Sequence, residues 1–468
     1  MKKKGRKKGY KRQPWFWGMI SQKEAEDFLK EKPQNAEFLV RSAYFQEETI
    51  FIVSIVAVSD RGETVDFKHY RAHAPGSKWI LESFPSRHKT LIDLVYHYSQ
   101  NYIGMTGLKL KIAKKQPRWL LKSYNIMVPK KAIALGSGNF SEVVIGAFRR
   151  RLVAVKILTS QGDRLLAERE SLMKEANMMK HLDHPYITKM IGVSVDSSLP
   201  MILVELMSNN LLSHLEHYGK YTTFGEKLLY CWQFANGLKF LAQQHIVHRD
   251  IAARNALFSR YGILKVSDFG LSDYEKNLTV MSLSHEQLPA KWLPPESLKK
   301  SGIMFNEKTD VWMFGVACNE IFRNGLPPLP HIAKPQFEIL AFKDGDQLHV
   351  LPKFIPDDIR DCFNTKIFKE KNSERANFAE IFAIFDAWVH IKYPPPPIER
   401  RTVQMIPHCR PLTTAEYEIL WYNDKDWLPA NQAAMVERET ARRKNKNEDA
   451  ADLPKEKNQA KQWRKDFT

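Results

Sequence analysis

The sequence predicts an α+β protein with two folded domains and basic ends. Its 468 residues are too many for one compact core, and its hydrophobic fraction of 43% is enough for two. Patterns typical of helices and strands alternate from about Trp15 to Val389, and a run of four prolines after Tyr393 then ends the folded region. We divide the chain into a basic arm (1–13), a first domain (14–104), a linker (105–123), a second domain (124–390) and a C-terminal extension (391–468).

The first domain is predicted to hold a sheet between two helices. Its first helix follows a capping box, Ser21 to Glu24, in which each of the two side chains accepts a hydrogen bond from the other residue's backbone N–H. Three stretches rich in β-branched and aromatic residues follow, at 37–41, 49–58 and 65–72. A second amphipathic helix is expected over 90–99.

Arg41 is the most informative residue of this domain. It ends the apolar strand Phe38 to Arg41, where a guanidinium is costly to bury without an anion. One explanation is an internal salt bridge, and the other is a bidentate grip on a phosphate group.

In the second domain, residues His248 to Asn255 contain the groups that phosphoryl transfer from a metal-bound nucleotide requires. Asp250 would accept the proton of the attacking hydroxyl, and Asn255, five positions later, would hold a magnesium ion. An ordinary polar turn could have the same composition.

Three further motifs favour the chemical interpretation. Asp268-Phe269-Gly270 follows a short apolar strand, so its carboxylate could reach metal-bridged phosphates. Leu135 to Val143 contains glycines that let backbone N–H groups approach phosphates. Lys156 interrupts an apolar strand, and Glu175 lies beside the apolar stripe of a helix expected within 170–182, where the two could form an ion pair.

These motifs, in this order, resemble the protein-kinase family from about Trp119 to Val389. The resemblance implies a bilobal kinase fold that uses ATP and Mg²⁺. Asp250 would be the base, and Asn255 and Asp268 would be the metal ligands. Arg254 would assist near the phosphoryl group that is transferred. The residues implied to bind ATP are Gly136, Ser137, Gly138, Val143, Ala154, Lys156, Glu205 and Met207.

The acceptor implied by the resemblance is tyrosine. Ala252-Ala253-Arg254 resembles the tyrosine-specific branch, as does Leu288 to Trp292, where Pro289 and Trp292 would bind the substrate. Asp310 is expected to brace the catalytic loop and Glu296 to pair with Arg375.

Three positions depart from the family pattern: Ser141 in the glycine loop, Val280 in place of the usual regulatory tyrosine, and Pro294 near the end of the activation segment. We therefore predict that activity does not require phosphorylation at position 280.

The first domain resembles the Src-homology 2 (SH2) family through Phe38 to Arg41, the opening Trp15 to Gly18, and His69-Tyr70-Arg71. The resemblance implies phosphotyrosine binding through Arg41, with His69 and Arg71 as secondary contacts. Gln22 and Ala43 stand where the family commonly has phosphate donors, which predicts weaker binding than is usual for the family.

Charge and cysteine content bear on the location of the protein. The net charge of +18 lies largely in the two ends, and the basic arm is either a disordered solubilising segment or a site for anionic lipid or nuclear import. The four cysteines are far apart, no apolar run could cross a bilayer, and lysines follow Met1, so a cytoplasmic protein with reduced thiols is expected. Attachment to a membrane surface stays open.

The combined features indicate a non-receptor protein-tyrosine kinase of signal transduction, most like the Fes/Fer group. Its expected partners are proteins with an acceptor tyrosine and proteins that contain phosphotyrosine. The alternative is a kinase-shaped adaptor without turnover. Specific nucleic-acid binding is not expected, because the basic arm has one aromatic residue, Tyr10, and no series of aromatic residues interleaved with its charges. Trp119 is expected to pack against the small lobe, and regulation of one domain by the other is a hypothesis.

Overall fold

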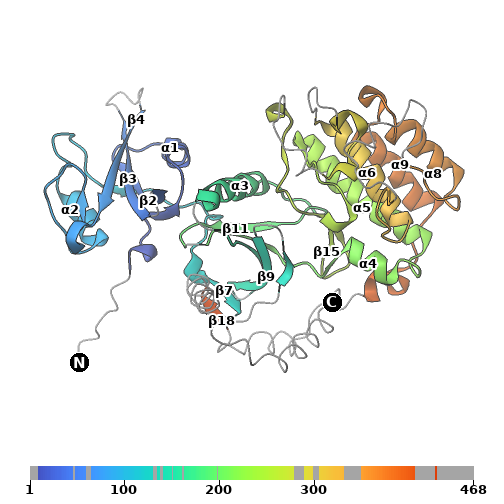
Figure 1. Ribbon diagram of the computed structural model, residues 1–468, viewed down its shortest axis with the longest axis horizontal. Helices are drawn as coiled ribbons and strands as arrows, with labels where there is room; N and C mark the ends of the chain where they lie inside the picture. Colours follow the sequence, from blue (N-terminus) through green and yellow to red (C-terminus); the bar gives the residue numbers. More distant parts are fainter. Residues whose placement is uncertain are drawn as a thin grey trace. The chain divides into compact units, whose positions relative to one another are not determined.

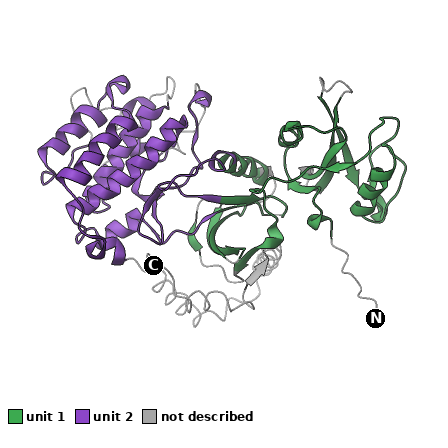
Figure 2. Ribbon diagram, turned by 180° about the vertical axis from the view of Figure 1, so that it is seen from behind, with its two compact units in different colours: residues 1–176, 191–203, 425–448 green, residues 177–190, 204–424, 449–468 purple. Residues whose placement is uncertain are grey.

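The computed structural model describes residues 9–45, 48–58, 65–129, 134–137, 141–149, 151–160, 163–197, 199–278, 289–298, 305–330, 349–405 and 427–429 (Figure 1). The chain forms two compact units (Figure 2). Unit 1 contains residues 1–176, 191–203 and 425–448, and unit 2 contains residues 177–190, 204–424 and 449–468.

The first domain lies in unit 1 and has the predicted architecture of a sheet between two helices (Figure 1). The strand order is β1-β2-β3-β4-β5, β6 pairs with β2, and the β2–β3–β4 meander is antiparallel. The strands and helices are β1 (Phe16–Met19), α1 (Gln22–Lys30), β2 (Glu37–Phe45), β3 (Glu48–Val58), β4 (Val65–His73), β5 (Ile80–Leu81), α2 (Leu91–Gln100) and β6 (Ile112–Ala113).

The predicted capping box starts α1. The Glu24 N–H donates to Ser21 Oγ at 3.2 Å, and the Ser21 N–H donates to the Glu24 carboxylate at 2.7 Å. One sheet face and α2 enclose an apolar core that includes Val40, Val53 and Leu94. The opposite face carries α1 and the polar residues discussed below.

Unit 1 also holds a seven-stranded sheet, in the order β11-β12-β10-β9-β7-β18 with β8 on β9. Its elements are β7 (Ile126–Pro129), β8 (Ala134–Ser137), β9 (Ser141–Phe148), β10 (Arg151–Leu158), α3 (Asp163–Met179), β11 (Met190–Ser194), β12 (Met201–Glu205) and β18 (Trp427–Pro429). Helix α3 begins seven residues earlier than the predicted segment 170–182 and ends three residues earlier.

The prediction that the folded region ends at the four prolines is wrong, because Thr402 and Val403 are buried beyond them. Strand β18, further along the chain, was not predicted either. It comes from the C-terminal extension and pairs antiparallel with β7, so that Leu428 lies opposite Val128.

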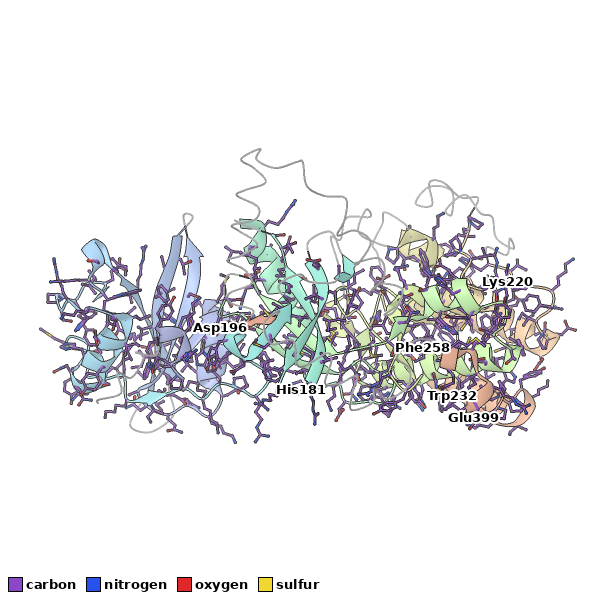
Figure 3. All side chains as sticks on the ribbon, turned by 90° about the horizontal axis from the view of Figure 1, so that it is seen from below. His181, Asp196, Lys220, Trp232, Phe258 and Glu399 are labelled. Carbon is purple, nitrogen blue, oxygen red and sulfur yellow. The ribbon has the colours of Figure 1, made fainter. Side chains whose placement is uncertain are left out.

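Unit 2 is mainly helical, and α5 packs against both α6 and α9. Its aromatic core includes Phe314, which contacts the rings of Phe378 and Phe385, and the fully buried Phe258 (Figure 3). The elements are β13 (Asn209–Asn210), α4 (Leu211–Tyr218), α5 (Phe224–Gln243), β14 (Ile246–Val247), β15 (Ala256–Phe258), β16 (Leu264–Val266), β17 (Asp273–Tyr274), α6 (Glu307–Phe322), α8 (Asp357–Cys362) and α9 (Phe378–Ala387).

Among the residues that the structure describes, no helix is both long and apolar enough to span a bilayer.

Candidate active site

The predicted ion pair of Lys156 and Glu175 is present in unit 1. Lys156 Nζ lies 3.0 Å from one Glu175 carboxylate oxygen and 3.3 Å from the other. Glu175 is buried because it flanks the apolar stripe of α3. A buried carboxylate of this kind fixes the position of the lysine ammonium at one end of β10.

The strand register aligns Lys156 with two other predicted ATP contacts. Gly136 of β8 lies opposite Val143 of β9, which lies opposite Lys156 of β10. A Cβ added at Gly136 would meet no heavy atom within 4 Å, so packing among the described residues does not require glycine there. Close approach of a phosphate to the backbone remains a reason for it. Gly138 lies outside the described residues.

The predicted adenine-binding segment, Glu205 to Met207, leads into unit 2. The Glu205 N–H donates to the Lys189 carbonyl at 2.9 Å, and the Glu205 carboxylate accepts from Lys265 Nζ at 2.8 Å. The Glu205 N–H is therefore engaged, and adenine contacts from this segment would come from the Glu205 carbonyl and the Met207 backbone.

In unit 2, Asp250 is the centre of a local hydrogen-bond network. Asn255 Nδ2 donates to Asp250 Oδ2 at 2.7 Å and to the Asp250 carbonyl at 2.8 Å. The Arg254 guanidinium donates to Asp250 Oδ1. These contacts fix the orientation of both carboxylate oxygens.

Asp310 braces the start of this loop, as predicted. Its carboxylate accepts from the His248 N–H at 2.6 Å and from the Arg249 N–H at 3.0 Å. Burial raises the pKa of Asp310 to about 7, while these two donors favour the charged form. Arg249 has a φ of 66°, a strained value for a residue with a side chain, and the Asp310 contacts hold it there.

Asp268 is brought to the same end of the β15–β16 hairpin as Asn255. Ala256 and Val266 are paired, and the Ser267 N–H donates to the Asn255 carbonyl at 2.9 Å. Asp268 follows with a φ of 62° and is exposed, whereas Phe269 is buried. The hairpin thus places three oxygen-bearing side chains, Asp250, Asn255 and Asp268, on loops that leave one end of it.

Glu320 of α6 was missed by the sequence analysis. One of its carboxylate oxygens accepts from Trp292 Nε1 at 2.9 Å and from the Ala253 N–H at 3.0 Å. Burial raises the pKa of Glu320 to about 7. The Arg254 guanidinium lies 4.5 Å from the Trp292 ring centroid. The available signal was one acidic residue in the mostly apolar second half of α6, next to Asn319.

The expected pair of Glu296 and Arg375 is bidentate, with distances of 2.6 and 3.0 Å. Pro289, the other residue predicted to bind substrate, is partly exposed just before the short helix of Trp292. Val280, with Thr279, Ser282 and Ser284, lies outside the described residues.

The predicted phosphate anchor of the first domain, Arg41, is 4% exposed. Its Nε lies 3.3 Å from Ser54 Oγ, and one terminal nitrogen lies 3.4 Å from the Ile20 carbonyl. Glu26 and Glu24 attract Arg41 electrostatically, but among the described residues no carboxylate forms a salt bridge with it. The internal salt bridge that could have explained this arginine is therefore not found.

The sheet register brings the other predicted contacts to the same face. Arg41 lies opposite Ile52, which lies opposite Arg71, and Ser54 lies opposite His69. Arg71 Nε is buried and has no hydrogen-bond partner among the described residues.

Within unit 1, the first domain contacts the seven-stranded sheet and α3. The Met19 N–H donates to the Val195 carbonyl at 2.6 Å, and Glu24 forms an ion pair with the buried Arg169 of α3. Trp119 lies 6.0 Å from the Phe28 ring, and the neighbouring Leu120 forms a β-bridge with Val193.

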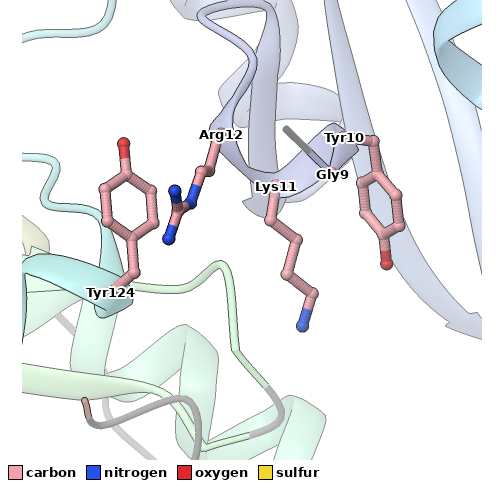
Figure 4. Close-up of a pocket in the computed structure, with 5 residues that line it drawn as sticks. All are labelled: Gly9, Tyr10, Lys11, Arg12 and Tyr124. Atoms are coloured by element: carbon pink, nitrogen blue, oxygen red, sulfur yellow. The ribbon is translucent and has the colours of Figure 1, made fainter. Parts of the chain in front are cut away.

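Asp196, labelled in Figure 3, accepts from the Ser123 N–H at 2.9 Å and so fixes the end of the linker. A pocket of about 250 Å³ in this region is lined by Gly9, Tyr10, Lys11, Arg12 and Tyr124 (Figure 4).

Both domains match known families. Residues 130–385 match the family described as "Protein tyrosine and serine/threonine kinase", and residues 15–98 match the SH2 domain. The chain belongs to the protein-kinase family. Because an SH2 domain precedes its kinase domain and relatives include the Fer-related and Fps kinases, it is a non-receptor protein-tyrosine kinase of the Fes/Fer type.

The relatives differ in how much of their own length they share with this kinase. Fer-related kinase 1 of Caenorhabditis elegans is 32% identical over 69% of this chain and 80% of its own length. The transforming protein Fps of avian sarcoma virus (strain PRCII) is 28% identical over 74% of this chain and 62% of its own length. The transforming protein Abl of Abelson murine leukemia virus is 30% identical over 80% of this chain and 49% of its own length.

Proposed function

We propose that this kinase transfers the γ-phosphoryl group of ATP to tyrosine residues of proteins, with Asp250 as the base. The observation that carries the proposal is the network in which Asn255 and Arg254 hold the two carboxylate oxygens of Asp250. A base must be held within hydrogen-bond reach of the hydroxyl that it deprotonates. In this mechanism the tyrosyl hydroxyl loses its proton to Asp250 as its oxygen forms a bond to the γ-phosphorus, and the bond between that phosphorus and the β,γ-bridging oxygen breaks, which releases ADP.

The residues of the hairpin end fit a magnesium ion. Asp268 offers an exposed carboxylate, and Asn255, whose amide nitrogen is directed at Asp250, turns its Oδ1 away from it. Oxygen atoms of carboxylates and amides are the ligands that Mg²⁺ prefers. When bound, the ion would neutralise charge on the phosphates.

Lys156, in the seven-stranded sheet of unit 1, would hold the phosphates. Glu175 fixes its ammonium, and the backbone at Gly136 lies two strands away in the same register row. Lys156 and Glu175 exchange no proton in this mechanism, because Glu175 positions the ammonium of Lys156 and that ammonium neutralises charge on the phosphates.

The decisive test compares Asp250→Asn and Lys156→Met with the wild type in phosphorylation of a tyrosine-containing copolymer. We expect turnover to fall by about 10²–10⁴-fold in Asp250→Asn, the usual contribution of a general base. Thermal unfolding controls for folding. If the wild type also shows no ATP-dependent labelling, the adaptor alternative replaces this proposal.

We also propose that phosphotyrosine-containing proteins bind the SH2 domain through Arg41, with His69 and Arg71 as secondary contacts. The support is a buried guanidinium that forms two long hydrogen bonds, of 3.3 and 3.4 Å, among the residues that the structure describes. A cytoplasmic location is part of the proposal, since one relative is named a cytoplasmic tyrosine-protein kinase (BMX of Homo sapiens, 30% identical over 72% of this chain). Residues 1–8 of the basic arm lie outside the described residues, so binding of this arm to a membrane surface is not part of the proposal.

A further inference from the structure

We propose that Glu26 is a built-in competitor of phosphotyrosine, which occupies the N–H of His69 and lowers the affinity of the Arg41 pocket for a phosphate dianion. The inference rests on the proposed role of Arg41 and adds a residue that weakens the same site. Glu26 projects from α1, and its Oε1 accepts from His69 Nε2 at 2.9 Å and from Gln22 Nε2 at 2.8 Å.

A hydrogen-bond chain connects Glu26 to the phosphate anchor. Arg41 Nε–H donates to Ser54 Oγ at 3.3 Å, and Ser54 Oγ lies 2.9 Å from His69 Nδ1. A serine hydroxyl has one proton, so when it accepts from Arg41 it can donate that proton to Nδ1. His69 is then neutral, and its single N–H is on Nε2 and points at Glu26.

The electrostatics agree with this tautomer. Burial lowers the pKa of His69, which favours the neutral ring, and the donors Gln22 and His69 lower the pKa of Glu26, which keeps it a carboxylate near neutral pH. A phosphate oxygen that bound His69 would have to take the N–H from Glu26. It would also bring its negative charge close to that carboxylate.

The neighbouring charges do not compensate for Glu26. Gln22, on the same helix, is neutral, and Glu24 is committed to Arg169. From β2 and β4, Arg41 and His69 are the groups that face Glu26, and Arg41 attracts it. The charge of the main phosphate anchor, Arg41, is therefore partly offset before the ligand arrives, although Arg71 lies on the same face of the sheet.

The opposite possibility is that Glu26 helps binding by orienting the His69 ring. The variant Glu26→Gln distinguishes competition with phosphate from orientation of His69, because the amide oxygen still accepts a hydrogen bond from His69 while the negative charge is removed. If Glu26 competes through its charge, the variant binds more tightly. If it only orients His69, binding is unchanged or weaker.

The experiment titrates the full chain with a fluorescent phosphotyrosyl peptide whose flanking residues are uncharged. We expect Glu26→Gln to bind about threefold more tightly, an effect of the size usual for a partly exposed charge, and the gain to shrink at high salt. The matched control is Glu31→Gln, which removes the same charge at the exposed end of α1. Unchanged or weaker binding by Glu26→Gln, or an equal gain in the control, overturns the inference.

Two further variants separate this inference from the function on which it rests. If Arg41→Ala and Arg41→Lys bind the peptide as well as the wild type does, the pocket itself is misassigned. If both lose binding while Glu26→Gln shows no gain, only the role of Glu26 is wrong. Equal unfolding temperatures of wild type and Glu26→Gln exclude a folding effect.

Discussion

Two buried arginines of this kinase have nearly equal exposure and opposite surroundings. Arg375 in unit 2 is 2% exposed, and Arg41 in the SH2 domain is 4% exposed. Arg375 donates to both carboxylate oxygens of Glu296 and to the carbonyls of Lys308, Lys369 and Glu370. Within the described part of the chain, Arg41 forms two hydrogen bonds, of 3.3 and 3.4 Å, and neither acceptor is an anion.

The difference separates a structural charge from a binding charge. The donors of Arg375 are satisfied within the protein, so its removal leaves backbone acceptors unpaired and the partly exposed carboxylate of Glu296 without its partner. Burial lowers the pKa of Arg41, which means that interactions within the domain do not fully compensate for the desolvation of its charge. A bound external anion would provide the missing compensation.

The largest expected effect is on stability, from Arg375→Ala. Breaking a fully buried ion pair by removing one partner costs about 3–5 kcal/mol. Because the side chain of Glu296 is 25% exposed, we expect a loss near the lower end of this range in the free energy of unfolding of unit 2. Urea unfolding followed by circular dichroism measures it. The control is Arg360→Ala, whose partner Asp357 is mostly exposed, so that less than about 1 kcal/mol is expected. Equal losses in the two variants would show that Arg375 is not the structural charge that the comparison requires.

In Arg41→Ala we expect a large loss of phosphopeptide binding and a small loss of stability. We expect phosphopeptide binding to fall by about 10-fold to 100-fold, since charge-assisted hydrogen bonds to phosphate are lost. The free energy of unfolding of the SH2 domain should change less in Arg41→Ala than that of unit 2 changes in Arg375→Ala, because Arg41→Ala removes few hydrogen bonds within the protein. Peptide titration and urea unfolding on the same preparation test both parts. A large loss of stability without loss of binding would contradict the assignment.

Contacts that belong to a local pattern or to a known family motif could be predicted from the sequence. The capping box at Ser21 is local, and it is present. The ion pair of Lys156 with Glu175 and the brace of the catalytic loop by Asp310 join residues 19 and 62 positions apart, and they were predicted because these residues belong to the motifs by which the chain resembles kinases. The catalytic roles of these residues stay predictions.

The contacts that the sequence could not reveal join residues far apart in the chain. Glu320 meets Ala253 only because α6 packs beside the catalytic loop, and Glu26 meets His69 only because α1 covers the polar face of the sheet. Strand β18 pairs with β7 from almost 300 positions away, and three residues carry too little pattern to predict a strand. Such contacts follow from tertiary packing, which no local pattern encodes.

A third buried arginine, Arg169 of α3, lies between these two extremes and gives the smallest expected effect. It is 3% exposed and forms an ion pair with Glu24 of the SH2 domain, while its Nε is buried without a partner among the described residues. Six residues further along α3, Glu175 holds Lys156. The ion pair therefore connects the SH2 domain to the helix that positions a predicted ATP contact.

Glu24→Gln should weaken this connection without disrupting α1, because glutamine also completes a capping box. We expect turnover of the tyrosine copolymer to fall by about twofold to fivefold, since a less restrained α3 holds Glu175 less firmly. Peptide binding at Arg41 should change less than it does in Glu26→Gln, because Glu24, which also attracts Arg41, forms an ion pair with Arg169. The matched control is again Glu31→Gln, on the same helix. If turnover in Glu24→Gln equals that of the control, Arg169 resembles Arg375 in being structural, and the contact between the SH2 domain and α3 does not regulate catalysis.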